Sequence, residues 1–313
     1  MFHNPLNYNE PLFRPPGEAS SAILQATIGC SWNDCAFCEM YTSKKFKTRN
    51  FEEIKDDIKV LSDYYRGYVK KVFLADGDAF VLSSNKLFPI LNEINKRFGK
   101  LQRISSYALP KHILSKTDKE LVELRELGLK LLYIGIESGD DELLKLINKG
   151  ETFSSTAEGI QKAHEAGIDT SIMIINGLGG KIYSVQHALK SAEIITRVNP
   201  KFLSTLTLSL PFGNEHFNNR FQGDYIQQTI VELFQELKIF IENLNVENII
   251  YRSNHVSNNL ILSGTLSKDS TALIRQIEVA IEKTPKHLIP MCVQKDTVAF
   301  ERLQWYNTDR CFK

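Results

Sequence analysis

Short apolar runs alternate with longer amphipathic stretches through the first two thirds of the chain. Each apolar run has the length and hydrophobicity of a strand that is buried in a parallel sheet. The expected strands are residues 23–28, 71–75, 103–108, 130–136, 170–176 and 202–210. Helical patterns lie between them, at residues 51–65, 86–98, 118–127, 140–148, 155–166 and 184–198. Ser84, Thr117 and Ser184 are plausible helix caps, and Gly128 and Gly167 mark two helix ends.

Six strand–helix units predict an α/β fold with right-handed crossovers and a parallel sheet. Six units are fewer than the eight of a closed barrel, so the pattern predicts a partial, open (β/α)6 barrel with a C-terminal α/β extension. In the extension, a polar loop at 211–223 precedes a helical pattern at 225–244, a strand at 248–252 and a helical pattern at 268–283. The expected division is an N-terminal leader at 1–21, the barrel at 22–215, and an extension at 216–313 that covers the barrel mouth.

Composition adds little to this fold but narrows the function. Of the 313 residues, 42% are hydrophobic and 24% are charged, as in soluble globular proteins with a full core. A net charge of +1 gives no overall electrostatic reason to bind nucleic acid or an anionic membrane. No stretch reaches transmembrane length, and the proline-containing leader has no apolar core, so it is not expected to be a signal peptide. Five cysteines, three of them clustered, argue against a disulfide framework and favour a reducing cytoplasm.

The clustered cysteines, Cys30, Cys35 and Cys38, follow the first expected strand with the spacing C-x4-C-x2-C. Three soft thiolates on one loop suit a cubane iron–sulfur cluster. With three thiolates, one iron lacks a protein ligand, which favours catalysis over electron transfer. The alternative is zinc, which takes four ligands. Cys292 and Cys311 could complete such a site, but they show no recognisable pairing, and their role stays open.

With this motif, residues 22–210 resemble the radical S-adenosylmethionine (radical SAM) superfamily. The resemblance is closest to the subgroup of oxygen-independent coproporphyrinogen oxidase, elongator-type enzymes and methylthiotransferases. That superfamily usually has C-x3-C-x2-C with an aromatic residue before the last cysteine. Phe37 matches the aromatic residue, and the spacing here has one extra residue. The resemblance implies that the three cysteines hold a [4Fe–4S] cluster and that the open iron binds the amine and carboxylate of SAM.

The same resemblance implies contacts to SAM at the ends of the later strands. Asp76-Gly77-Asp78 would hold the ammonium group, although Asp-Gly-Asp is also a common turn. Glu137 would reach the ribose hydroxyls, and Lys149, twelve residues later, the carboxylate of SAM. The plainer interpretations are a helix-capping acid for Glu137 and a solvated lysine for Lys149. The remaining expected cofactor contacts are Phe37, Ser106, Ser138, Met173 and Asn176.

Substrate contacts are predicted less directly. Tyr107 ends the third expected strand, and Arg252, Asn254 and His255 follow the strand of the extension. If that strand joins the sheet, these side chains reach the active-site mouth, although a lone histidine is more often structural.

The resemblance implies an enzyme in which a 5′-deoxyadenosyl radical abstracts hydrogen from an unidentified small molecule. The outcome would be oxidation, rearrangement or carbon–carbon bond formation, so the enzyme could be an oxidoreductase, a lyase or a transferase. The electron donor would be reduced flavodoxin or ferredoxin. The basic run Lys44, Lys45, Lys47 and Arg49 would be either a solvated surface or its docking patch. The alternatives are an RNA-modifying enzyme, for which no basic face or appended module is evident, and a non-catalytic iron–sulfur or zinc protein.

Overall fold

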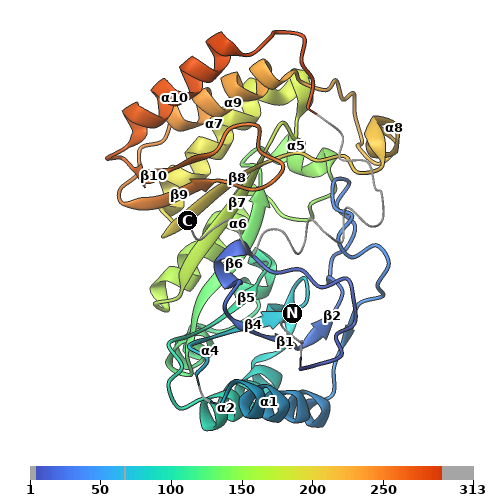
Figure 1. Cartoon of the computed structure of the whole chain (residues 1–313), viewed down its shortest axis with the longest axis vertical. Helices are drawn as coiled ribbons and strands as arrows, with labels where there is room; N and C mark the ends of the chain where they lie inside the picture. Colours follow the sequence, from blue (N-terminus) through green and yellow to red (C-terminus); the bar gives the residue numbers. More distant parts are fainter. Residues whose placement is uncertain (1–4, 67, 291–313) are drawn as a thin grey trace.

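One eight-stranded sheet organises the chain in this computed structural model, which describes residues 5–66 and 68–290 (Figure 1). The strand order is β1-β4-β5-β6-β7-β8-β9-β10. Neighbours are parallel as far as β9, and β10 is antiparallel to β9. The strands of this sheet are β1 (Ala22–Gln25), β4 (Lys71–Ala75), β5 (Arg103–Tyr107), β6 (Leu129–Glu137), β7 (Asp169–Asn176), β8 (Phe202–Thr207), β9 (Ile249–Ser253) and β10 (Leu262–Leu266). A separate two-stranded pair joins β2 (Thr27–Ile28) to β3 (Lys47–Thr48).

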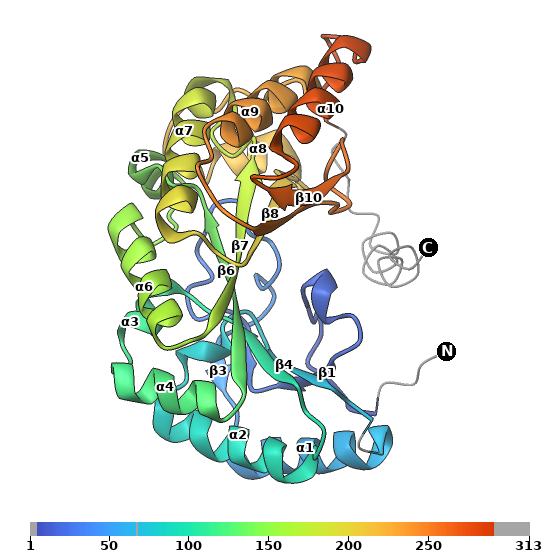
Figure 2. The ribbon, with the colours of Figure 1, turned by 90° about the vertical axis from the view of Figure 1, so that its left-hand side faces the viewer.

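Helices wrap the convex side of the sheet (Figure 2). The described α-helices are α1 (Phe51–Tyr65), α2 (Ser84–Arg97), α3 (Pro110–Leu114), α4 (Asp118–Glu126), α5 (Asp141–Leu146), α6 (Phe153–Glu165), α7 (Gly180–Val198), α8 (Gly213–Asn218), α9 (Ile230–Glu242) and α10 (Ser270–Lys283). Two short 3-10 helices, η1 (Pro16–Glu18) and η2 (Ala79–Val81), are also present. Local sequence explains several starts. Thr117 and Thr229 form capping boxes with Glu120 and Glu232, and Asn50 caps α1.

The expected open α/β architecture is confirmed: the six predicted strands correspond to β1, β4, β5, β6, β7 and β8, which are parallel, and β9 adds a further parallel strand. The extension continues the same sheet through β9 and β10. The helical pattern expected at 184–198 begins earlier, at Gly180, so Ser184 lies inside α7 and is not its cap. Ser84 likewise lies inside α2, whose cap position is Ser83. The elements that the pattern did not predict are α3, α8 and β10, each of five or six residues, and the shorter β3, η1 and η2.

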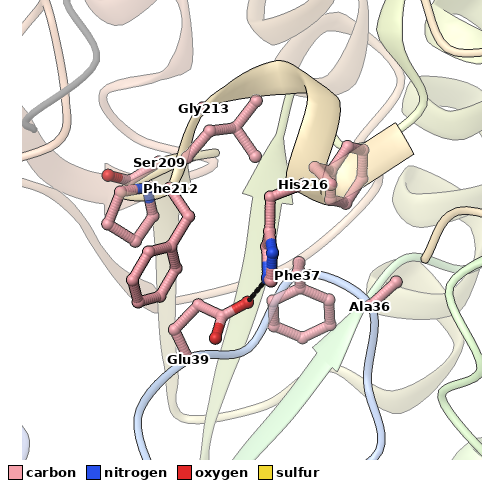
Figure 3. Close-up of a pocket in the computed structure, with 10 residues that line it drawn as sticks. Ala36, Phe37, Glu39, Ser209, Phe212, Gly213 and His216 are labelled. Atoms are coloured by element: carbon pink, nitrogen blue, oxygen red, sulfur yellow. Dashed lines mark hydrogen bonds and ion pairs between the residues drawn. The ribbon is translucent and has the colours of Figure 1, made fainter. Parts of the chain in front are cut away.

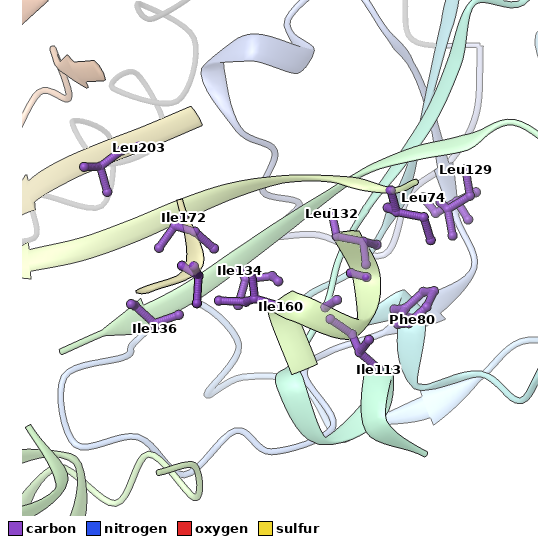
Figure 4. Close-up of a cluster of buried hydrophobic side chains, with 14 of the residues drawn as sticks. Leu74, Phe80, Ile113, Leu129, Leu132, Ile134, Ile136, Ile160, Ile172 and Leu203 are labelled. Carbon is purple, nitrogen blue, oxygen red and sulfur yellow. The ribbon is translucent and has the colours of Figure 1, made fainter. Parts of the chain in front are cut away.

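The two faces of the sheet bury different sets of side chains. Leu74, Leu132, Ile172 and Leu203 point to the helices and form the main core (Figure 4). The opposite, concave face carries a smaller aromatic cluster that includes Phe73, Tyr107, Tyr133, Met173 and Phe202. This assignment fixes which strand residues can face a ligand inside the open barrel.

The leader packs on the concave face, where η1 is the short dark-blue helix of Figure 2. The Tyr8 hydroxyl donates to the Ile23 carbonyl over 2.6 Å. Glu18 is fully buried and accepts from Arg103 over 2.5 Å and from the Tyr133 hydroxyl over 2.7 Å. The leader therefore covers the concave face over β1, β5 and the middle of β6.

None of the described helices combines the length and the hydrophobicity needed to cross a lipid bilayer.

Candidate functional site

The three predicted cluster ligands lie on the loop that leads from β2 to β3, at the carboxyl end of β1. All three are free thiols; Cys35 is buried, and Cys30 and Cys38 are partly buried. Carboxyl ends of parallel strands are the usual place for binding sites in α/β proteins. The ends of β4, β6 and β7 lie at the same edge, so residues distant in sequence surround this cysteine loop, residues 30–38.

Burial raises the pKa of each thiol in the cysteine loop. The pKa of Cys35 rises to about 11 and that of Cys38 to about 12, in both cases mainly by desolvation. Desolvation also raises the pKa of Cys30. Such thiols are protonated near neutral pH, and a bound metal would be needed to hold them as thiolates.

Asp76, in the turn after β4, binds the start of the cysteine loop. Its side chain is fully buried, and Oδ2 accepts from Gly29 N over 3.0 Å, from Gln25 Nε2 over 3.2 Å and from Lys44 Nζ over 2.6 Å. Lys44 Nζ also donates to the Asn9 carbonyl of the leader over 2.6 Å. The leader, the cysteine loop and the turn after β4 are thus joined through one buried ion pair.

This ion pair corrects the interpretation of residues 44–49 as a continuous basic surface. Lys44 is buried, and Arg49 pairs with Asp57 over 2.5 Å and donates to the Gln25 carbonyl over 2.9 Å. Only Lys45 and Lys47 of this run are exposed. The fold uses the other two charges internally, which a charge count along the sequence does not reveal.

The rest of the turn after β4 presses against Cys30. A Cβ atom on Gly77 would lie 2.9 Å from the Cβ of Cys30 and 2.5 Å from the Tyr41 ring, so only glycine fits there. Asp78 is fully buried; its Oδ2 accepts from Ser31 Oγ over 2.5 Å and lies 2.7 Å from His112 Nδ1. Among the described atoms, the carboxylate oxygens Asp76 Oδ1 and Asp78 Oδ1 are buried without a hydrogen-bond partner. Such orphaned acceptors beside a loop of thiols are suited to a ligand that carries donors.

A second buried ion pair lies on the other side of the loop. Glu137, at the end of β6, accepts from Lys149 Nζ over 3.0 Å, with both side chains almost fully buried. Glu137 has a φ of 65°, and the missing side chain of Gly135 leaves room for its carboxylate. Burial alone would lower the pKa of Lys149, but Glu137 and the nearby Cys35 outweigh it, and the pKa is raised. Lys149 therefore stays charged beside the thiols.

Two hydrogen bonds to backbone carbonyls fix the loop to the segment that follows α5. Trp32 Nε1 donates to the Asn148 carbonyl over 2.7 Å, and Ala36 N donates to the Ile147 carbonyl over 2.8 Å. The Trp32 ring also packs against Gly150, where a Cβ atom would collide with it. These contacts explain why Lys149, between Asn148 and Gly150, arrives next to the cysteines.

The structure does not bring every predicted cofactor contact to the loop. Ser106 lies on the helix side of the sheet, and its hydroxyl donates to the carbonyl of Tyr107 over 2.9 Å. Asn176 also faces the helices and donates to the Leu233 carbonyl of α9 over 3.0 Å. The Ser138 hydroxyl bonds to His187 Nδ1 of α7 over 2.8 Å. These three side chains are engaged with the surrounding scaffold.

The other predicted contacts do lie toward the site. Phe37 has Lys149 Nζ 5.9 Å from its ring centroid, and Met173 and Tyr107 lie on the concave face. Tyr107 makes edge-to-face contacts with Phe73 and Tyr133, and its burial raises its pKa.

The predicted substrate contacts of the extension differ among themselves. Arg252 is exposed on β9, and Asn254 is exposed just beyond its carboxyl end. His255 is half-buried; its Nδ1 bonds to Ser257 Oγ over 2.8 Å, and burial lowers its pKa. The structure thus leaves Arg252 and Asn254 accessible and engages His255 in a local turn.

Residues in and just after α8, which the sequence did not indicate, also bind the cysteine loop. Arg220, just after α8, donates to the Cys35 carbonyl over 2.8 Å and to Glu39 over 2.6 Å. His216 of α8 lies 2.8 Å from the same Glu39 carboxylate, in a pocket that Phe37 and Phe212 also line (Figure 3). No periodicity or motif marks α8, so only the folded chain reveals this contact.

The residues present fit the expected cofactors. Three protonatable thiols on one loop, a glycine that allows close approach, orphaned carboxylate oxygens and a charged lysine are the donor set that a cubane cluster and an amino-acid ligand require. Within the part of the chain that the structure describes, no three ligating side chains converge on one point. A cubane needs no such convergence, because its thiolates bind separate irons.

The chain is similar in sequence to proteins of a known family. Residues 24–192 match the family model of the radical SAM superfamily. A protein named a methylthiotransferase in Methanocaldococcus jannaschii is 26% identical over 177 residues, which are 52% of this chain and 38% of that protein. A tRNA-2-methylthio-N(6)-dimethylallyladenosine synthase of Thermodesulfovibrio yellowstonii is 27% identical over 53% of this chain and 38% of that protein. The chain thus spans less than two fifths of the length of these relatives.

Among solved structures, coproporphyrinogen III oxidase from Escherichia coli, described as a radical SAM enzyme, has a TM-score of 0.53. It is 18% identical and covers 71% of this chain and 52% of its own, so it shows the shared fold alone. Because the family model covers more than half of the chain, the chain belongs to the radical SAM superfamily, whose members use a [4Fe–4S] cluster and S-adenosylmethionine.

Proposed function

We propose that this chain is a radical SAM enzyme that acts on a small molecule. The observation that carries the proposal is the Glu137–Lys149 pair, which lies beside Cys30 and Cys35 although more than 100 residues separate them in sequence. A buried charge pair next to buried thiols is costly unless a ligand uses it. This pair supports a site for cluster and SAM together.

In this proposal Cys30, Cys35 and Cys38 each hold one iron of the cluster. When bound, the cluster and SAM would supply the radical chemistry that removes a hydrogen atom from the substrate. Asp78 Oδ1 would accept from the ammonium of SAM, because it is buried beside Cys30 and lacks another donor among the described residues. Gly77 allows the backbone to approach.

Glu137 and Lys149 would divide the remaining polar groups of SAM between them. The Glu137 carboxylate has one oxygen on Lys149 and a second oxygen that can accept from the ribose hydroxyls. Lys149 places its positive charge at the carboxylate of SAM, without the two-pronged geometry of an arginine. Phe37 and Met173 supply apolar surface near these groups.

Enzymes of this superfamily need a reductant and a substrate. We propose reduced flavodoxin or ferredoxin as the donor, for which Lys45 and Lys47 remain exposed after the cysteine loop. The thiols and an oxygen-sensitive cluster favour a reducing cytoplasm. RNA modification is the second candidate, because one relative is named as a synthase that acts on tRNA.

The test is the cleavage of SAM by the protein after anaerobic reconstitution with iron and sulfide. Reduction with dithionite should release 5′-deoxyadenosine, slowly, even without a substrate. A fully reconstituted and reduced sample that releases none would overturn the proposal. That outcome would favour a non-catalytic iron–sulfur or zinc protein. If the enzyme modifies RNA instead, addition of bulk tRNA should raise the rate of 5′-deoxyadenosine release.

A further inference from the structure

A row of neighbouring residues crosses the concave face from β6 to β10, at the far edge of the sheet. Strand pairing places Gly135 of β6 beside Met173 of β7, Met173 beside Ser204 of β8, Ser204 beside Arg252 of β9, and Arg252 beside Ser263 of β10. In each strand from β7 to β10, the residue just before the row belongs to the core on the helix side; these residues are Ile172, Leu203, Tyr251 and Leu262. The row therefore faces the inside of the open barrel.

This half of the concave face is more open than the half beneath the leader. Met173 and Ser204 are partly exposed, and Arg252 and Ser263 are exposed. Over β1, β5 and the middle of β6, by contrast, Tyr8 and Glu18 of the leader are hydrogen-bonded to the sheet. A substrate that reaches the site along the concave face would therefore lie over β7 to β10.

Arg252 is the cation of the row, and among the described residues it uses little of its hydrogen-bonding capacity. Its Nη1 donates to the Tyr251 carbonyl over 2.7 Å. Across residues 5–66 and 68–290, no carboxylate lies within ion-pair distance of its guanidinium. A guanidinium has five N–H donors in a planar fork that matches a carboxylate or phosphate. The hydroxyls of Ser204 and Ser263, one strand away on each side, can donate to the same group.

We propose that Arg252, with Ser204 and Ser263, binds a carboxylate or phosphate group of the substrate, an inference that rests on the function proposed above. Strands lie about 4.8 Å apart, so Arg252 is roughly 14 Å across the sheet from Gly135. Gly135 neighbours Glu137, which the proposed function places on SAM. The substrate is thus a small anion whose charged group lies several bonds from the carbon that loses hydrogen, and Met173 packs against the segment between them.

The test uses the reconstituted holoprotein and two simple anions, inorganic phosphate and succinate, with potassium chloride as the control for ionic strength. Phenylglyoxal modifies accessible arginines, and mass spectrometry of peptides gives the rate at each one. Phosphate or succinate should slow the modification of Arg252 several-fold. Arg275, exposed on α10 and distant from the row in the sheet, should react at an unchanged rate. Protection by phosphate alone, or by succinate alone, identifies the anionic group.

A second measurement keeps the inference independent of the modification chemistry. The protecting anion should raise the melting temperature of the native protein and of the control Arg275→Gln, but not that of Arg252→Gln, because a ligand stabilises only the state that binds it. Equal reaction rates of Arg252 with and without both anions, or equal protection of Arg275, would overturn the inference. Deoxyadenosine release is recorded from the same samples. Release without protection of Arg252 refutes the proposed anion site alone. Protection of Arg252 without release refutes the proposed SAM chemistry alone.

Discussion

Replacement of Lys44 by methionine tests whether the buried pair with Asp76 fixes the cysteine loop. Lys44 Nζ lies 2.6 Å from Asp76 Oδ2, and their side chains are 3% and 0% exposed. The substitution removes this bond and the bond to the Asn9 carbonyl, and it leaves a carboxylate buried without its cation. Removal of one partner from a buried ion pair costs about 3–5 kcal/mol of folding free energy.

The double variant Lys44→Met/Asp76→Asn gives the matched comparison. It leaves no unpaired charge, so its loss of stability should be smaller than that of Lys44→Met. Lys45→Met is the control at the adjacent position, because Lys45 is exposed. Exposed substitutions of this kind change stability by about 0.5 kcal/mol or less.

The assay is urea unfolding of the reduced, metal-free protein, followed by circular dichroism under argon. Iron uptake on reconstitution is measured alongside, and it should fall in Lys44→Met because Asp76 also accepts from Gly29 N, next to Cys30. Equal midpoints for Lys44→Met and Lys45→Met would show that the pair does not contribute, and the role assigned to Asp76 would be refuted.

Three further outcomes follow from individual contacts. Glu137→Ala should weaken SAM binding by roughly 1.5–3 kcal/mol, as expected for a lost charge-assisted hydrogen bond, and unchanged affinity in calorimetry would contradict the assignment. Arg220→Gln should lower iron uptake with little loss of stability, since its bond to the Cys35 carbonyl positions the loop while the Glu39 pair is partly exposed; iron uptake equal to that of Arg275→Gln would argue against this role. Burial lowers the pKa of Lys116 from 10.5 to about 8. Between pH 8 and pH 10.5, Lys116 therefore carries its proton in the unfolded chain but has lost it in the folded chain. Unfolding at a series of pH values should therefore show the native protein gaining about 3 kcal/mol over Lys116→Met as the pH rises through this window, and a constant difference would contradict the shift.

The sequence predicts well what depends on periodicity or on local spacing. The strand–helix alternation, the cysteine loop, and the placement of Glu137 and Lys149 at the end of β6 and after α5 all rest on such signals. The sequence does not show which face of the sheet a residue of a buried strand occupies. Both faces of these strands are apolar, so hydrophobicity could not show that Ser106 points to the helices, whereas Ser105 points to the concave side.

Contacts between distant segments are also invisible in the sequence. Lys44 belongs to a run of basic residues that looks like a solvated surface, and only the fold places Asp76 against it. Arg220 lies in a polar loop whose short helix α8 has no periodic pattern of useful length. These residues support the site without carrying a motif of their own, so their positions depend on tertiary structure.

The central claim is that three cysteines on one loop hold a cluster that SAM can reach. The most direct measurement compares iron content, visible absorbance and deoxyadenosine release between the native protein and the variant Cys30→Ala/Cys35→Ala/Cys38→Ala after identical anaerobic reconstitution. The native protein should bind about four irons at this site and release deoxyadenosine on reduction, as the stoichiometry of a [4Fe–4S] cluster requires. The variant should lose the iron, the charge-transfer absorbance and the release together. A variant that keeps the same iron and the same absorbance would contradict the account.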